Sequence, residues 1–355
     1  RSLIADIGPL GAADANGVRL PAGFTSRVIA RAGQVVAGTS YEWHRMPDGG
    51  VTYGTEDGGW IYVSNSEIPL IGGVGAIRFD AAGEITSAYR TLDRTQVNCA
   101  GGKTPWHTWL SCEEIARGRV FETDPWGETD AIVRPALGVF KHEAATVDPV
   151  RAHVYLTEDD SEGRFYRFVP DAMMAGGHPD LNSGRLEVAV VAGDDTVTWV
   201  ELPDPQFTGA VPTRMQIAES TRFRGGEGIW FHEDVVYFTT KGDNRVWAYD
   251  VLTSRISTIY DGGALAEPGI VGVDNIAVTC CGDVLVAEDG GSMQIVAILP
   301  DSGELRPIMQ IVGHDGSEVT GPAFDPSGTR LYFSSQRGED GGVTFEVTGP
   351  FHEPA

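Results

Sequence analysis

The chain has 355 residues, of which 41% are hydrophobic, and it contains 46 glycines and 20 prolines. Its 50 acidic residues outnumber 26 basic ones, and the formal net charge of −24 disfavours binding to nucleic acid or anionic membranes. No apolar run reaches eighteen residues, so we expect no membrane span. The many glycines and prolines favour short strands joined by turns over long helices.

Six apolar segments along the chain resemble one another and end in polar clusters. They are WIYVSNSE from Trp60, HTWLSCEE from His107, HVYLTEDD from His153, VVYFTTKGD from Val235, DVLVAEDGG from Asp283 and RLYFSSQRG from Arg330. Successive starts are separated by 47, 46, 82, 48 and 47 residues. The surplus in the third interval is assigned to a polar insertion at about 170–207, which is rich in Gly, Pro and Asp.

Similar segments flank these strands. Before them stand NCAGG (98–102), KHEAATVDP (141–149), GGEGIWFHED (225–234), VDNIAVTCCGD (273–283) and TGPAFDPSG (320–328), and after them GAIRFD, RFYRFVP, RVWAYD and QIVAILP. A period in the forties with short strands predicts an all-β fold, a six-bladed β-propeller. We expect a single domain over residues 1–355, with blades from about 40 to 345. The alternative is a sandwich whose strands share a spacing by chance.

Polar side chains, most of them carboxylates, gather at one rim of the predicted propeller, where some strands end and others start. Strand ends supply Asn65, Glu67, Cys112, Glu113, Glu114, Glu158, Asp159, Asp160, Asp243, Glu288 and Asp289, and strand starts supply Asn98, His142, Glu143, Glu227, Asp274 and Asn275. Like charges that converge on one axis take up protons or cations. Hard carboxylate oxygens suit Ca²⁺, Mg²⁺ or Fe³⁺, whereas a thiolate suits a transition metal, so a mixed metal cluster is expected in the central channel.

The cysteines leave several interpretations open. Cys112, in the stretch TPWHTWLSCEE (104–114), is either a metal ligand or a buried free thiol, and Glu113 and Glu114 are either ligands or a solvated turn. Cys99 and Cys112 could also form a disulfide. Cys280 and Cys281 are adjacent, and a disulfide between neighbours is strained.

Two segments carry a family resemblance. TPWHTWLSCEE followed by GVFKHEAATVD (138–148) resembles the pattern of PhoX-type alkaline phosphatases, and GGEGIWF, DNIAV and SNSE are similar to other family segments. The resemblance implies a propeller with a Ca²⁺ and Fe³⁺ cluster, which hydrolyses phosphate monoesters outside the cytoplasm. It implies that Cys112, Glu113, Glu143 and Glu227 are metal ligands. Four further metal ligands are expected from their position at the rim: Glu67, Glu114, Asp159 and Asp289.

The resemblance also has departures. His107 stands where glycine is usual, and the family's Arg-Pro-Glu segment reads Phe223-Arg224-Gly225-Gly226-Glu227, so the arginine lies one position further from the glutamate. Arg224, Glu227 and Lys241 are the expected catalytic residues, with Arg337 as a further candidate for binding phosphate. We expect a monomeric, secreted or periplasmic enzyme, whose signal peptide is absent from this chain and whose partner is a small phosphate ester.

Two other functions fit parts of the sequence. A calcium-dependent lactonase or esterase would hold one Ca²⁺ through Glu67, Asn275 and Asp289, but it leaves Cys112 without a role. A propeller that binds protein or sugar partners without catalysis would use its metals only to stabilise the strands around the axis. Catalytic sites keep an open coordination position, whereas structural sites close it.

Overall fold

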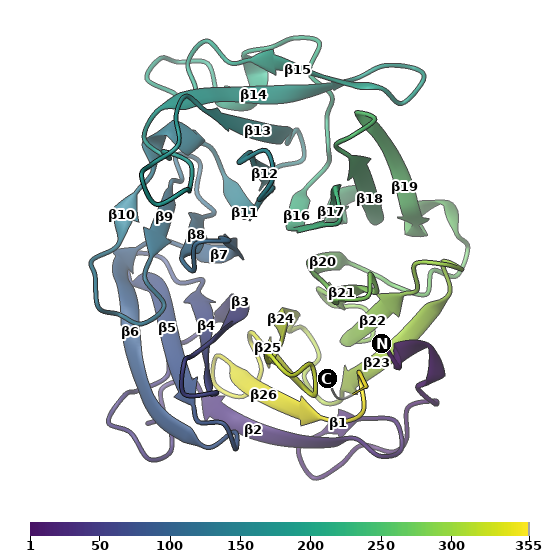
Figure 1. Ribbon diagram of the computed structural model, residues 1–355. Coiled ribbons are helices and arrows are strands. Elements are labelled where there is room, and N and C mark those ends of the chain that lie inside the picture. Colours follow the sequence, from purple (N-terminus) through teal and green to yellow (C-terminus); the bar gives the residue numbers. More distant parts are fainter. Residues whose placement is uncertain (354–355) are drawn as a thin grey trace.

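The computed structural model describes residues 1–353, and it is a six-bladed β-propeller (Figure 1). The prediction of the fold is confirmed. Each blade is an antiparallel sheet whose first strand lies at the central axis. The described residues also form five short 3₁₀ helices. One, Ile4–Asp6, precedes the first strand, and four lie between strands: Pro135–Leu137, Thr213–Met215, Lys241–Asp243 and Gly262–Ala264. Within residues 1–353, no helix has the length and apolar character needed to cross a membrane.

The first three blades follow one another along the chain. The first contains β3 (Pro47–Gly54), β4 (Trp60–Ser66), β5 (Gly72–Phe79) and β6 (Ile85–Thr95). The second contains β7 (Asn98–Lys103), β8 (Trp109–Glu113), β9 (Val120–Thr123) and β10 (Ile132–Val133). The third contains β11 (His142–Val147), β12 (Val154–Glu158), β13 (Phe165–Pro170), β14 (Gly184–Val191) and β15 (Val197–Glu201). The polar insertion therefore supplies the two outer strands of the third blade.

Of the last three blades, the fifth and the sixth include strands from the start of the chain. The fourth contains β16 (Gly226–His232), β17 (Val235–Thr240), β18 (Arg245–Asp250) and β19 (Arg255–Asp261). The fifth contains β20 (Val273–Val278), β21 (Val284–Glu288), β22 (Gln294–Ile298), β23 (Leu305–Ile311) and β1 (Val18–Arg19). The sixth contains β24 (Val319–Phe324), β25 (Arg330–Ser335), β26 (Val343–Thr348) and β2 (Thr25–Arg31). Because β1 and β2 complete two later blades, hydrogen bonds between the two ends of the chain close the ring.

How deeply a strand is buried depends on its position within the blade. The inner strands β11 and β20 are buried at every residue, as is the second strand β4, because their neighbours cover both faces. The outer strand β6 is largely half-exposed. Apolar side chains pack between neighbouring blades; one such cluster joins Leu110 and Val120 of the second blade to Val154 and Leu156 of the third. These clusters hold the inner strands in fixed positions around the axis.

Candidate metal centre

A β-bulge recurs near the start of every inner strand. The pairing register shifts between Pro47 and Gly50 in the first blade, and shifts at the equivalent place in the other five. The residue just inside the bulge is Asp48, Cys99, Glu143, Glu227, Asp274 and Gly321 in blades one to six. Bulges re-aim a side chain, so this backbone feature presents an acid or a thiol at the same place in five blades.

Small residues follow the bulge because the inner strands approach each other closely. A Cβ atom on Gly228 would lie 2.5 Å from the backbone nitrogen of Ile276 in the next blade, and one on Gly49 would lie 2.6 Å from Cα of Ala100. Larger side chains would push the blades apart. The close packing of the backbone is therefore what brings the bulge residues within reach of one another.

Nine side chains line the axis as four overlapping groups, and within each group one ligand atom per residue lies within 4.8 Å of the others. The groups are Asp48, Glu67 and Cys99; Cys99, Glu114 and Glu143; Glu143, Glu227 and Asp274; and Asp274, Asp289 and Glu318. We call these nine residues the axial ring. All six blades contribute to it. In the sixth blade Glu318, three residues before Gly321, takes the place of a bulge residue.

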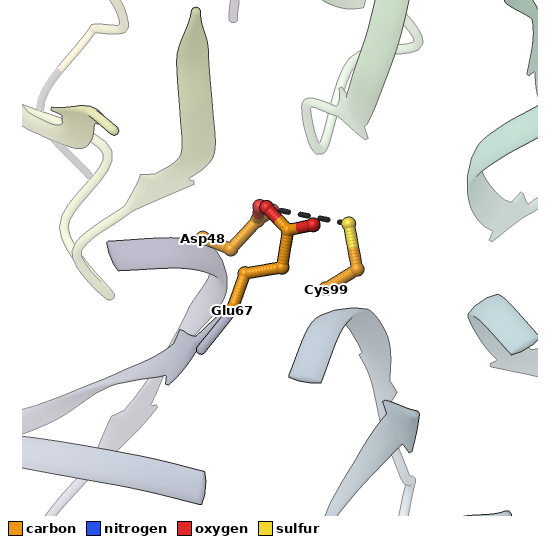
Figure 2. A group of neighbouring side chains, drawn as sticks. All are labelled: Asp48, Glu67 and Cys99. Atoms are coloured by element: carbon orange, nitrogen blue, oxygen red, sulfur yellow. Dashed lines mark hydrogen bonds between the residues drawn. The ribbon is translucent and has the colours of Figure 1, made fainter. Parts of the chain in front are cut away.

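Figure 2 shows the group formed by the first two blades, in which the side chains of Asp48, Glu67 and Cys99 point toward one another. Sγ of Cys99 donates a hydrogen bond to Oδ2 of Asp48 over 3.5 Å. Gln336, from the sixth blade, donates through its side-chain amide to both Asp48 and Glu67. A thiol and two carboxylates thus share one site at the junction of three blades.

Glu143 is the most isolated acid of the ring. Its side chain is fully buried, and neither carboxylate oxygen has a hydrogen-bond partner among the described residues. Burying a charge without a partner is strongly unfavourable. Burial, and then the charges of Glu227 and Glu114, raise the pKa of Glu143 well above its usual range. This carboxyl group therefore needs either a proton or a bound cation.

Burial and neighbouring negative charges also raise the pKa of other members of the ring. Burial and then the charge of Glu318 raise the pKa of Asp48, and burial raises the pKa of Glu114 to about 8 although Lys141 partly opposes the shift. Burial and then Asp48 raise the pKa of the Cys99 thiol. The ring therefore retains protons when no cation neutralises it.

Three basic side chains lie against the ring. Nζ of Lys241 lies 3.0 Å from Glu227, 3.1 Å from Asp274 and 3.1 Å from Asp289. Lys141 pairs with Glu114 over 2.8 Å, and Arg337 pairs with Glu318 over 2.7 Å and with Asp289 over 3.2 Å. The eight carboxyl groups of the ring exceed these three cations. The donor set, with its orphaned oxygens, fits hard cations together with one metal that accepts a thiolate.

The structure brings five of the expected metal-ligating residues into the ring: Glu67, Glu114, Glu143, Glu227 and Asp289. It places three others elsewhere. Asp159 lies beside the ring, where its Oδ2 accepts a hydrogen bond from Lys141 over 3.2 Å. Glu113 is buried, and its oxygens accept hydrogen bonds from the backbone nitrogens of Gln96 and Arg119.

Cys112 requires the largest correction. Its side chain is fully buried within the apolar cluster between the second and third blades, together with Leu110 and Val120, and it belongs to none of the four groups of the axial ring. Successive side chains of a strand point to opposite faces, so β8 cannot direct Cys112 and its neighbours to one site. The thiol at the axis is Cys99, and the structure shows both cysteines as free thiols, so they form no disulfide with each other.

Four members of the ring are not among the metal ligands predicted from the sequence: Asp48, Cys99, Asp274 and Glu318. The repeat pattern places Asp274 at the rim but does not single it out as a ligand. The repeats contain the signal for two others, because Asn98-Cys99-Ala100 and Pro47-Asp48-Gly49 occupy the register of His142-Glu143-Ala144. Nothing in the repeat marks Glu318, which lies outside that register. His142 is buried, stacks on Phe140 at 3.6 Å between ring centroids and contacts the backbone oxygen of Gly138.

The expected catalytic residues lie at the end of the fourth blade that contributes to the axial ring. Glu227 and Lys241 belong to the ring and its cations. The backbone oxygen of Arg224 accepts a hydrogen bond from the backbone nitrogen of Gly242, next to Lys241. The Arg224 side chain is exposed and has no ion-pair partner within residues 1–353.

The residues expected for a lactonase are not grouped together. Glu67 and Asp289 lie in different groups of the ring, and both polar atoms of the Asn275 side chain form hydrogen bonds, with Asp274 and with Gly321.

Comparison with solved structures shows the same fold. PhoX from Pseudomonas fluorescens, solved in complex with vanadate, a transition state analogue, superposes with a TM-score of 0.73 at 18% identity, over 97% of both chains. The gluconolactonase XC5397 from Xanthomonas campestris has a TM-score of 0.51 at 13% identity, over 97% of this chain and 98% of that one. Regucalcin, a calcium-binding protein from Agrobacterium tumefaciens, has a TM-score of 0.51 at 16% identity, over 93% and 97%.

Sequence comparison identifies the family. No curated protein matches the sequence. The family model described as alkaline phosphatase PhoX matches residues 64–124 and 116–262, which together span more than half of the chain and include five of the nine ring residues, Glu67, Cys99, Glu114, Glu143 and Glu227. The protein therefore belongs to the PhoX alkaline phosphatase family.

Proposed function

We propose that this protein is a metal-dependent phosphomonoesterase whose metal cluster is held by the axial ring. The observation that carries the proposal is the buried Glu143 carboxyl group, which has no hydrogen-bond partner within residues 1–353 and belongs to two groups of the ring. Protein interiors seldom retain such a group without a function. Family membership supplies the reaction class.

The donor set divides the ring into two chemical halves. Cys99 belongs to two of the four groups and would hold a metal that accepts a thiolate, for which Fe³⁺ is our proposal. The groups around Asp274 contain only carboxyl groups and would hold Ca²⁺. Bound cations would supply positive charge for the phosphate and a lowered pKa for a coordinated water. Without them, the excess of carboxylates would repel a phosphate ester.

The basic side chains would act on the substrate's oxygens. Lys241 pairs with three carboxylates of the ring. If bound cations neutralised those carboxylates, the ammonium group would be less strongly held and could donate hydrogen bonds to a phosphate oxygen. Arg224 forms no ion pair with a carboxylate in the part of the chain that the structure describes, so its exposed guanidinium would be available for a bidentate contact with phosphate. Glu227 would serve as a ligand and would orient Lys241.

The function is tested by metal analysis and hydrolysis assays on one preparation. Protein purified without added metals is analysed for calcium and iron, then assayed with p-nitrophenyl phosphate and with a sugar lactone. We expect both metals, phosphate ester hydrolysis that a chelator abolishes, and loss of both metal binding and activity in Glu143→Gln. Hydrolysis of the lactone alone would favour the lactonase function, and bound metal without either activity would favour a binding propeller.

A matched pair of thiol variants locates the thiolate-binding metal. Cys99→Ser alters the ring, whereas Cys112→Ser alters only the apolar cluster between the second and third blades. We expect a visible thiolate-to-iron absorption band that is lost in Cys99→Ser and retained in Cys112→Ser. A band lost only in Cys112→Ser would contradict the proposed ligand set.

A further inference from the structure

A pair of adjacent cysteines lies on the turn that joins β20 and β21. The axial ring uses Asp274, near the start of β20, whereas Cys280 and Cys281 follow the end of that strand, so they occupy the opposite end of the fifth blade. Both side chains are exposed, and their Sγ atoms are 3.3 Å apart. The two thiols are thus in contact with each other and accessible from solvent.

The turn is fixed by a neighbouring threonine. Oγ1 of Thr279 accepts hydrogen bonds from the backbone nitrogens of Cys281 and Asp283, over 3.2 and 3.1 Å, and donates to Oδ2 of Asp283 over 2.9 Å. The backbone nitrogen of Thr279 also donates to the oxygen of Asp283 over 3.0 Å. These bonds hold the backbone around both cysteines, so the contact between the thiols is maintained by the turn.

A small reagent can reach the pair. Cys280 lines a surface cavity of about 550 Å³, together with Trp230, Thr279 and Lys103. The other two cysteines of the chain are buried, Cys99 in the axial ring and Cys112 in the apolar cluster. Susceptibility to thiol reagents follows exposure. Reaction of the folded protein with thiol reagents in solution should therefore be concentrated at this turn.

We propose that Cys280 and Cys281 form a redox-active dithiol, which closes reversibly to a vicinal disulfide by exchange with a low-molecular-weight disulfide. One cysteine loses its proton, and its thiolate attacks the reagent disulfide, forming a mixed disulfide and releasing one small thiol. The thiolate of the second cysteine then attacks the protein sulfur of that mixed disulfide and releases the second small thiol. Two electrons pass from the protein to the reagent, which is reduced to two thiols.

The geometry favours the second step. The two sulfurs must approach from 3.3 Å to a bonding distance of about 2.05 Å. The ring that this bond closes is strained, because the Cα atoms of adjacent residues are only about 3.8 Å apart. The attacking thiol is held beside its target, so its effective concentration exceeds that of any free thiol in dilute solution. Strained and exposed disulfides are easily reduced, so the closed form should reopen under mild reduction.

The proposal is tested by mass spectrometry of the folded, metal-loaded protein. The neutral reagent 2-hydroxyethyl disulfide is used, because the acidic protein would repel an anionic one. After acid quenching, unfolding and alkylation, we expect the peptide spanning residues 280–281 to have lost two hydrogens and to be unalkylated. Cys99 and Cys112 should be alkylated as free thiols. Brief treatment with dithiothreitol should restore two alkylated cysteines at 280–281.

Single variants provide the matched control. Cys280→Ser and Cys281→Ser each lack the resolving thiol, so each should accumulate one stable adduct, at a level at least about tenfold above that in the wild-type chain. Stable adducts on both cysteines of the wild-type protein, or two unreacted thiols after the variants have reacted, would overturn the proposal. Far-ultraviolet circular dichroism checks that every variant is folded.

Discussion

The Sγ atom of Cys99 lies 3.5 Å from Oδ2 of Asp48, and the two residues stand just inside equivalent bulges of neighbouring blades. This contact joins the first two blades at the axis and begins the series of acidic side chains that reaches the sixth blade. A thiol in this position loses its proton when it binds a metal, and its pKa is raised by burial and then by Asp48 in the metal-free protein. Metal binding at Cys99 should therefore release protons.

Replacing the two buried thiols should separate function from stability. Cys99→Ser should reduce iron content and phosphatase activity, because a hydroxyl group is a poor ligand for a thiophilic metal. Cys112→Ser should leave metal content unchanged but cost about 1–3 kcal/mol of unfolding free energy, since it buries a hydroxyl group in an apolar cluster. Elemental analysis and chemical denaturation measure the two effects. Equal loss of metal in both variants would contradict the assignment.

Glu143→Gln should change stability in opposite directions with and without metal. In the chelated protein the substitution removes a buried acid without a partner, so we expect a midpoint of thermal unfolding that is higher by roughly 2 °C. In the metal-loaded protein it removes a ligand, so the midpoint should fall. Glu113→Gln, outside the ring, should not show this reversal. Calorimetry with and without chelator checks the prediction, and a lower midpoint in both states would refute it.

The metal-free protein should lose stability as the pH rises. Burial raises the pKa of Glu114 from near 4.5 to about 8, so between these values the folded chain binds more protons than the unfolded chain. Each such group lowers the unfolding free energy by up to about 1.4 kcal/mol per pH unit across that window. Denaturation of chelated protein from pH 5 to 8 should show this slope, and Glu114→Gln should reduce it. A stability that increases with pH would count against it.

Bound metal should reverse that pH dependence. Cations bind the deprotonated carboxylates and thiolate, so protons compete with metal and affinity should fall as the pH is lowered. Thermal unfolding of the metal-loaded protein should therefore show greater stability at pH 8 than at pH 5. Identical pH profiles for loaded and chelated protein would show that the metal does not bind at the ring.

Arg224 should be required for phosphate recognition. Arg224→Ala removes an exposed guanidinium without an ion-pair partner in residues 1–353, whereas Arg222→Ala removes one already paired with Glu162 over 2.7 Å. We expect a tenfold to hundredfold lower kcat/KM for Arg224→Ala, roughly the effect of losing one charge-stabilising donor, and a change within about twofold for Arg222→Ala. Inhibition by vanadate should weaken in parallel. Equal effects in the two variants would exclude a specific role.

The architecture can be predicted from the pattern of residues along the chain. The recurrence of apolar segments near every 47 residues reports one supersecondary unit per blade, because each blade can bury its faces only against a similar neighbour. The convergence of Glu67, Glu114, Glu143, Glu227 and Asp289 on the axis followed from the same register. These features are local and periodic, so they are visible in the order of residues.

Which thiol lies at the axis could not be predicted in this way, because it depends on contacts between blades. Cys112 stands in the more conspicuous motif, yet the alternation of β8 sends it into the apolar cluster, and the bulge of β7 directs Cys99 to the ring. Glu318 joins the ring from outside the repeat, because Gly321, with a φ of 60°, occupies the bulge position of the sixth blade. The direction of a side chain depends on backbone irregularities and contacts between blades, which the residue pattern does not specify.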